Sequence, residues 1–295
     1  MGVAGSSGRR EGWSPAPFAT RLPVIGLVIV VALAAVIRPA APIVFVGLLF
    51  VYLIGRLFAG RSALAANLAP GAVAAVLPVA AILVWRSLPE PAADPTGADC
   101  ANLVAPPAIW RLLEAGVGLI TLVLLVRDRR GSLGDLGFRR GSRNVRLVAV
   151  AGLLVFTPIA IYAGTMLGGS ALGDAFFGSY TLNLSQPLAF LPAVVFAASN
   201  ALAEELAYRG AMRVWLAPTL GVMGANLAQA VVYGLSHTGD DFAGPEGMIP
   251  AVAATIAVGF LAGVITRRTN SLTIALAVHA AADIPIYLYW ACRIA

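Results

Sequence analysis

The sequence contains no lysine: all 20 basic residues are arginine, and only 12% of the 295 residues are charged. So low a charged fraction, with 59% hydrophobic residues and a mean hydropathy of +0.87, excludes an ordinary soluble domain and is typical of a polytopic membrane protein. The arginines are spread along the chain, so the net charge of +6 does not indicate a nucleic-acid partner. Codon bias in a GC-rich bacterial gene explains the missing lysine most simply.

Apolar runs near the length of a spanning helix, about 17–25 residues, recur along the chain. They are Leu22–Ile37, Ile43–Ala59, Leu68–Trp85, Ile109–Val126, Leu147–Leu167, Leu188–Ala203, Val222–Ser236, Met248–Thr266 and Leu272–Trp290. The first run is short, and Pro39 and Pro42 after it are compatible with a re-entrant turn. The sequence therefore predicts an all-α fold, a polytopic transmembrane helical bundle of eight to nine spans.

The arginines also predict the orientation of the bundle. With a cytoplasmic N-terminus, sixteen arginines fall on the cytoplasmic side and four on the other, namely Arg38, Arg86, Arg111 and Arg293. Because cytoplasmic loops carry the excess of basic residues, this count predicts a multi-pass protein of the plasma (inner) membrane with its N-terminus in the cytoplasm.

The chain divides into four predicted regions. Residues 1–21, rich in Gly, Ser, Arg and Pro, read as a disordered cytoplasmic tail, 22–126 as N-terminal transmembrane helices, 127–146 as a cytoplasmic Arg-rich loop, and 147–295 as a C-terminal helical domain. An acidic, Pro-rich external loop carries Cys100, and Cys292 lies on the same predicted side. A disulfide between them and two unpaired cysteines are both open.

Two adjacent carboxylates and an arginine follow an apolar run in "NALAEELAYRG". A charged side chain at the centre of a bilayer costs about 2.5–3.5 kcal/mol on insertion scales, so such residues indicate a functional site. Glu205 and Arg209 are four residues apart on one helix face, which predicts a supporting ion pair. Glu204 points elsewhere, on a face with Asn200 and Tyr208, and is left unpaired.

The two histidines both fall inside apolar helices. His237 ends a polar stripe that also contains Asn226, Gln229 and Tyr233, at spacings of three and four. The other, His279, lies four residues before Asp283. Neither polar face can be left in lipid, so both are predicted to meet the face of Glu204.

These residue types allow two chemistries. A carboxylate beside imidazoles can act as a general base on water while other donors stabilise an oxyanion. Glu204, His237 and His279 would equally supply the three protein ligands of a catalytic zinc ion, although the chain has no H-E-x-x-H motif. A purely structural role, with the histidines as interhelical hydrogen-bonding groups, is the third reading.

The order of four short motifs resembles the CPBP family, also called Abi, which comprises CAAX prenyl proteases and bacteriocin-processing or self-immunity membrane proteins. "EELAYR" (Glu204–Arg209) matches E-E-x-x-x-R, and "YGLSH" (Tyr233–His237) resembles F-x-x-x-H. "FLAG" (Phe260–Gly263) is similar to F-x-x-G, and "HAAAD" (His279–Asp283) to H-x-x-x-N or D. The resemblance covers Leu188–Tyr287, within the domain at 147–295.

The resemblance implies an intramembrane endopeptidase that cuts a peptide or membrane-protein substrate near the cytoplasmic face. By analogy Glu204 activates the water with help from His237, while His279 and Asp283 bind the oxyanion. The Glu205 carboxylate would hold the helix through its arginine partner. Family members are described both as metalloproteases and as glutamate-type proteases; the metal-free version is favoured here, with zinc as the alternative cofactor.

Two positions depart from the family pattern. Tyr233 adds a hydroxyl where Phe is usual and is taken as a supporting residue. Asp283 stands where the best-described members have Asn, and an ionised carboxylate cannot donate to an oxyanion. Asp283 would have to be protonated, orient His279, or bind a metal.

Two readings from other classes remain. A non-catalytic immunity factor or partner-binding scaffold would use the same polar core structurally. A transporter or channel is disfavoured because the polar residues lie on only three C-terminal helices.

Helix lengths raise a difficulty for any shared site. At 1.5 Å per residue from a cytoplasmic turn near Pro218, Glu204 lies about 21 Å away and His237 about 28 Å. The sequence therefore predicts tilt, a kink near Gly224 or Gly234, or a water-filled cavity.

Overall fold

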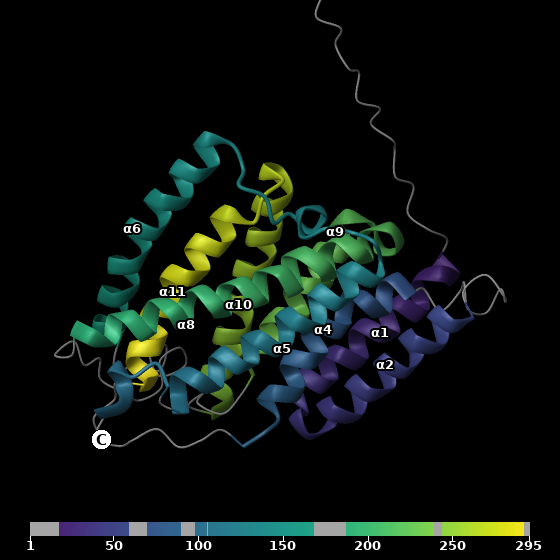
Figure 1. Cartoon of the computed structure of the whole chain (residues 1–295), viewed down its shortest axis with the longest axis horizontal. Coiled ribbons are helices and arrows are strands. Elements are labelled where there is room, and N and C mark those ends of the chain that lie inside the picture. The colour runs from purple at the N-terminus through teal and green to yellow at the C-terminus, as the bar shows by residue number, and fades with distance from the viewer. Residues whose placement is uncertain are drawn as a thin grey trace, which may run out of the picture.

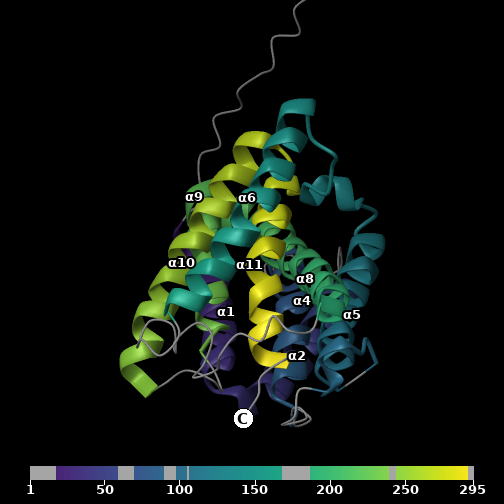
Figure 2. The same cartoon turned by 90° about the vertical axis from the view of Figure 1, so that its left-hand side faces the viewer.

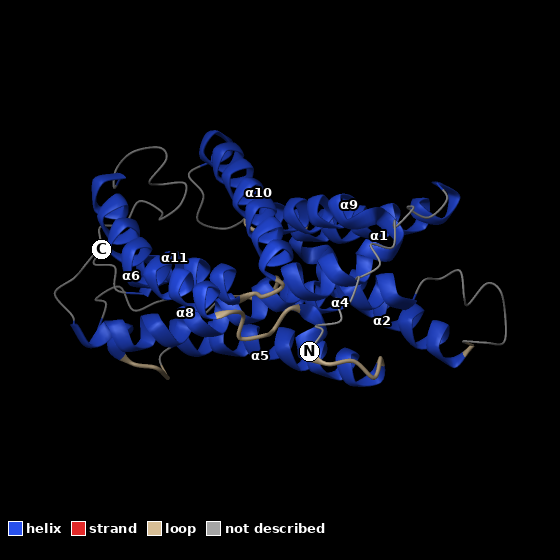
Figure 3. Cartoon of the chain, turned by 90° about the horizontal axis from the view of Figure 1, so that it is seen from above, coloured by secondary structure: helices blue, strands red, loops and turns tan. Residues whose placement is uncertain are grey.

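Helices make up all the regular structure in the described part of the chain, and no strand occurs there (Figures 1 and 3). The structure is a computed structural model, and it describes residues 18–58, 70–89, 98–104, 106–167, 187–238 and 244–291. The predicted all-α class is confirmed. Cys292 lies outside the described residues, so neither the disulfide with Cys100 nor the alternative of two unpaired cysteines is tested.

Nine long helices account for most of the described residues. In chain order they are α1 (Phe18–Val36), α2 (Ala41–Leu57), α4 (Pro70–Arg86), α5 (Pro106–Asp128), α6 (Arg143–Leu167), α8 (Phe190–Glu204), α9 (Arg213–Leu235), α10 (Gly244–Thr269) and α11 (Thr273–Ala291). Short 3-10 helices are η1 (Arg38–Ala40), η2 (Ala98–Ala101), η3 (Leu133–Leu136) and η4 (Pro187–Ala189), and a π-helix, η5 (Glu205–Met212), joins α8 to α9. The first helix begins inside the predicted tail at 1–21, of which residues 1–17 are outside the described part.

Several helices have the length and composition of membrane spans. Among the described residues five segments qualify: Arg38–Leu57, Ala108–Asp128, Arg143–Ala163, Phe190–Leu235 and Met248–Thr269. Three shorter apolar helices cover Thr20–Val36, Gly71–Arg86 and Thr273–Leu288. Large apolar side chains are widely exposed on the outer helix faces, which fits lipid rather than water as their surroundings. The chain is a multi-pass helical protein, while the count of eight to nine spans stays a prediction.

The long segment Phe190–Leu235 doubles back on itself at Gly221. This glycine has φ 76° and ψ 163°, values outside the helical region. Beyond it the chain returns along η5, so that the Tyr208 hydroxyl donates to the Ser236 hydroxyl oxygen at 3.0 Å. Counted from Gly221, Glu204 and His237 each lie about 25 Å along their helices. The reversal therefore places both side chains at the same level.

The sequence predicted different depths for Glu204 and His237 because the distances were counted from a turn near Pro218. The change of direction occurs at Gly221, and neither Gly224 nor Gly234 is kinked. Gly234 serves close packing instead, because a Cβ there would lie 3.0 Å from the Val252 carbonyl oxygen of α10.

Replacing Gly221 with alanine is expected to lower the free energy of unfolding by about 1–3 kcal/mol, because the φ and ψ values of this residue are accessible almost only to glycine. No atom lies within 4 Å of the added Cβ, so the cost is one of backbone strain. Gly116→Ala, in an open position of α5, is the control, and is expected to stabilise the helix by roughly 0.5–1 kcal/mol. Unfolding in mixed micelles measures both, and equal stabilities would contradict the assignment of the turn.

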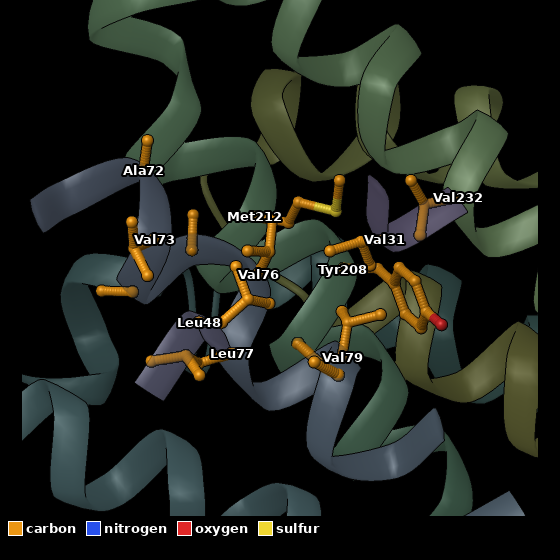
Figure 4. Close-up of a cluster of buried hydrophobic side chains, with 14 of the residues drawn as sticks. Val31, Leu48, Ala72, Val73, Val76, Leu77, Val79, Tyr208, Met212 and Val232 are labelled. Carbon is orange, nitrogen blue, oxygen red and sulfur yellow. The ribbon is translucent and has the colours of Figure 1, made fainter. Parts of the chain in front are cut away.

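The hairpin made by α8, η5 and α9 lies between two groups of helices. In the first group, α1, α4 and α5 pack on the hairpin and α2 packs on α4; in the second, α10 and α11 pack on the hairpin and α6 packs on α11 (Figures 1 and 2). Figure 4 shows an apolar cluster formed by the first group and the hairpin, in which Val31, Leu48 and Val76 lie with Tyr208 and Met212 of the hairpin. Helices α1, α4 and α5 are thus packed directly against the segment that carries the glutamates.

The predicted Arg-rich loop at 127–146 holds α11 in place. Its 3-10 helix η3 is capped by Asp135, which accepts from the Ser132 backbone N–H at 2.8 Å and from the Ser132 hydroxyl at 2.9 Å. These two donors lower the pKa of Asp135. Beyond η3, the Gly137 carbonyl accepts from the Leu272 N–H at 2.9 Å. The loop therefore anchors the turn between α10 and α11, seven residues before His279.

Candidate active site

Side chains from the hairpin and from α11 converge on one buried site. Nδ1 of His279 lies 2.8 Å from Oε1 of Glu205. Its Nε2 lies 3.6 Å from Oε2 of Glu204 and 3.5 Å from Oδ2 of Asp283. The structure thus brings these four predicted residues together around a single imidazole. Both glutamates are 1% exposed.

The second imidazole is fixed by its own helix. Nδ1 of His237 lies 2.7 Å from the Tyr233 carbonyl oxygen. Because a carbonyl can only accept, Nδ1 carries the proton and Nε2 of a neutral ring is left as an acceptor. The Tyr233 ring packs edge-on against both His237 and His279, with centroid distances of 4.6 and 6.0 Å. Tyr233 therefore contacts both histidines.

Glu205 and Arg209 form the ion pair that their spacing predicts. Nη1 of Arg209 lies 3.1 Å from Oε1 of Glu205, and both side chains are 1% exposed. The guanidinium also stacks on the Tyr233 ring, with its Cζ 3.8 Å from the centroid. The backbone here is the π-helix η5, a rare form that is frequent at functional sites. No pattern in the sequence signals it.

Glu204 is not unpaired, and this corrects the prediction. An ion pair joins its Oε1 to Nη2 of Arg86, the last residue of α4. The Nε of Arg86 donates to Oε1 of Glu114 at 2.7 Å, and Glu114 also contacts Arg111 at 2.8 Å. Sequence reasoning missed Arg86 and Glu114 because both lie on the N-terminal helices, where Arg86 was read as an external loop residue.

Oε2 of Glu204 has a different environment from Oε1. It is buried and has no hydrogen-bond partner among the described residues. Buried carboxylate oxygens are almost always satisfied, by protein or by ordered water, so an orphan oxygen indicates a position for a water or ligand. Nε2 of His279 lies 3.6 Å from this oxygen.

Residues predicted to share the Glu204 face have separate partners. The Asn200 amide donates to Oδ2 of Asp283 at 3.0 Å, and Tyr208 donates to Ser236. Asp283 is thereby held beside His279 by an amide from α8.

Half of the predicted polar stripe on α9 faces another helix. The Asn226 amide donates to the Phe260 carbonyl oxygen at 3.1 Å, and the Gln229 amide donates to the Gly259 carbonyl oxygen at 2.9 Å. A Cβ at Gly259 would lie 3.3 Å from Nη2 of Arg209. The glycines around the F-x-x-G motif therefore let α10 approach α9 closely enough for these bonds. Only the later part of the stripe lies at the site, where Tyr233 packs against His279 and His237 packs against Tyr233.

The arrangement of the donor side chains bears on the zinc alternative. Among the described residues no group of three or more His, Cys, Asp and Glu side chains has the arrangement of a metal site. One oxygen of Glu204 is taken by a guanidinium, a cation that competes with a metal ion for the same carboxylate. With Arg86 paired to Glu204, this arrangement does not favour a zinc ion, and the zinc site stays a prediction.

An apolar helical bundle that buries carboxylates and imidazoles together is a multi-pass membrane protein with an intramembrane polar site. Residues 185–285 match the family model of Type II CAAX prenyl endopeptidase Rce1-like proteins, which confirms the resemblance found in the motifs. No curated protein and no solved structure matches the chain. The matched segment contains all the predicted site residues, whereas Arg86 and Glu114 lie outside it.

Proposed function

We propose that the protein is an intramembrane endopeptidase that hydrolyses a peptide bond of a membrane-associated protein or peptide. The observation that carries the proposal is Oε2 of Glu204, a buried carboxylate oxygen beside Nε2 of His279 in the Rce1-like segment, with no hydrogen-bond partner among the described residues. This is where a nucleophilic water fits.

Glu204 acts as the general base in this mechanism. Its Oε2 takes a proton from the water as the water oxygen attacks the scissile carbonyl carbon, and Nε2 of His237 accepts a hydrogen bond from the same water. A tetrahedral intermediate with one oxyanion results. Collapse of the intermediate breaks the C–N bond, and Glu204 returns its proton to the leaving amine. The products are a carboxylic acid and an amine, so one water is consumed for each bond cut.

Donors on α11 and α8 stabilise the oxyanion. Because Nδ1 of His279 donates to Glu205, donation from Nε2 as well requires the imidazolium form of the ring. The Asp283 carboxylate accepts from Asn200 and orients His279 rather than donating. Asn200 carries a second amide hydrogen and can supply the donor that Asp283 lacks.

The site can be placed relative to the predicted membrane surface. His279 lies about 14 Å along the helix from Asn270, at the turn that contacts the Arg-rich loop. We propose that this loop marks the cytoplasmic surface and that the scissile bond lies about that far inside the plasma membrane. Arg209 is buried in the bundle and Arg86, 11% exposed, is paired inside it, so neither counts as a loop arginine. One is removed from each side, and the arginine majority still favours a cytoplasmic N-terminus.

The test compares new peptide termini in membranes of cells carrying the wild type or Glu204→Gln at equal expression. Termini present only with the wild type are expected, and they identify the substrate directly. The same termini are expected to form in the presence of a chelator, because the proposed base is a carboxylate without a metal. Identical profiles for both proteins would overturn the peptidase and favour the immunity or partner-binding scaffold.

A further inference from the structure

We infer that Arg86 is a positioning residue, supplied by the N-terminal helices, that fixes both Glu204 and the backbone next to His237. The inference rests on the proposed peptidase function. It also assigns a role in the site to α4 and α5, which lie outside the segment that matches the Rce1-like family.

The guanidinium of Arg86 joins three other helical elements. Its Nε donates to Glu114 of α5 at 2.7 Å, and its Nη2 pairs with Glu204 at the end of α8. Its Nη1 donates to the carbonyl oxygen of Ser236, the residue before His237, at 3.3 Å. Arginine presents five N–H donors in a rigid plane, so these bonds fix the relative positions of their three acceptors. Lysine, with a single ammonium group, cannot reproduce this fork.

This contact decides which oxygen of Glu204 is free to react. A carboxylate has two equivalent oxygens, and rotation about its last bond would exchange them. Arg86 engages Oε1, which leaves Oε2 as the oxygen beside His279. Without the guanidinium, Glu204 would be buried close to Glu205 with no fixed orientation.

Further contacts hold the Arg86 guanidinium and its carboxylate partner Glu114 in position. Glu114 is 2% exposed and contacts Arg111 through its second oxygen at 2.8 Å. Arg38, from η1, donates to the Arg86 carbonyl oxygen at 3.5 Å and to the Thr238 carbonyl oxygen at 3.4 Å. The end of α4 is thus joined to the end of α9 by the Arg38 side chain as well as by the Arg86 side chain.

Kinetics of the purified full chain in proteoliposomes test the inference. Arg86→Ala is expected to lower kcat about 100-fold, the effect of misplacing a reacting group by about 1 Å, with little change in KM. Added guanidinium chloride at non-denaturing concentration is expected to restore part of kcat in this variant and none in Glu204→Gln. Arg86→Lys is expected to remain well below the wild type. Arg56→Ala, which removes an ion pair between α2 and α5 at Asp128, is the control and is expected to keep the wild-type kcat.

The outcomes separate this inference from the proposed function. An active wild type with an equally active Arg86→Ala overturns the role of Arg86 alone, and an inactive wild type overturns both. A loss of kcat that guanidinium does not restore indicates a merely structural arginine and also overturns it. If Arg86→Ala does not fold, Glu114→Gln replaces it, because this variant keeps the volume and weakens the Nε anchor. Its kcat is expected to fall about 10-fold, and an unchanged value would overturn the inference.

Discussion

Glu204→Gln is expected to lower the kcat of the purified protein in proteoliposomes by about 10³-fold, within the range that a general base contributes. Glutamine keeps the shape of the side chain and can still accept from Arg86 through its amide oxygen, so the fold and KM should be retained. What it loses is the ability to take a proton at the position of Oε2, the buried oxygen that faces His279.

Glu204→Asp separates the position of the base from its charge. Aspartate keeps the carboxylate but withdraws it by one methylene, so it cannot both meet Arg86 and reach the water. A fall in kcat of about 100-fold is expected. Single-turnover measurements on the substrate found by terminus profiling give both values. If aspartate or glutamine left kcat at the wild-type level, Glu204 would not be the base.

Arg209→Met is expected to lower the free energy of unfolding by about 3–5 kcal/mol, the cost of breaking a buried ion pair on one side. Methionine fills much of the volume, but the Glu205 carboxylate then stays buried beside Glu204 without its cation. The stacking of the guanidinium on Tyr233 is lost as well. Unfolding in mixed micelles measures the change, and Arg140→Met, at an exposed loop position, is expected to stay within about 0.5 kcal/mol of the wild type.

The double variant Glu205→Gln with Arg209→Met completes the cycle. Removing both charges leaves no unpaired buried charge, so the double variant is expected to be more stable than Arg209→Met alone by about 1–3 kcal/mol. Strict additivity of the two single changes would show that the pair is not coupled, in contradiction to the 3.1 Å contact.

Local spacing predicted the parts of the site that lie within one helix. Glu205 with Arg209, and His279 with Asp283, are four residues apart, and helical geometry alone puts each pair on one face. The all-α class followed from hydropathy in the same way. Such inferences need no knowledge of how distant segments pack, and the structure reproduced both pairs.

Contacts between distant helices were beyond that reasoning, apart from the meeting of His279 with Glu204, which was expected because polar faces cannot be left in lipid. Arg86 is separated from Glu204 by 118 residues, and an arginine at the end of an apolar helix looks like any loop arginine. The turn at Gly221 was misplaced because Pro218 is the stronger breaker in the sequence, although proline is tolerated inside several helices of this chain. Asn226 and Gln229 share a face with His237, yet which helix they meet depends on where α10 packs.

The reversal at Gly221 makes the number of residues between Glu204 and His237 a functional quantity. One residue inserted between Glu204 and Gly221, or between Gly221 and His237, would turn every following side chain of that helix by about 100° and advance it by 1.5 Å. Glu204 and His237 would then no longer face the same site, because one of the two helices would be rotated relative to the other. Related genes that retain this chemistry should therefore preserve the interval between the two motifs, and length changes should accumulate in the connections outside it. Interval length is thus a criterion for sorting active from decayed copies of this protein in sequence collections.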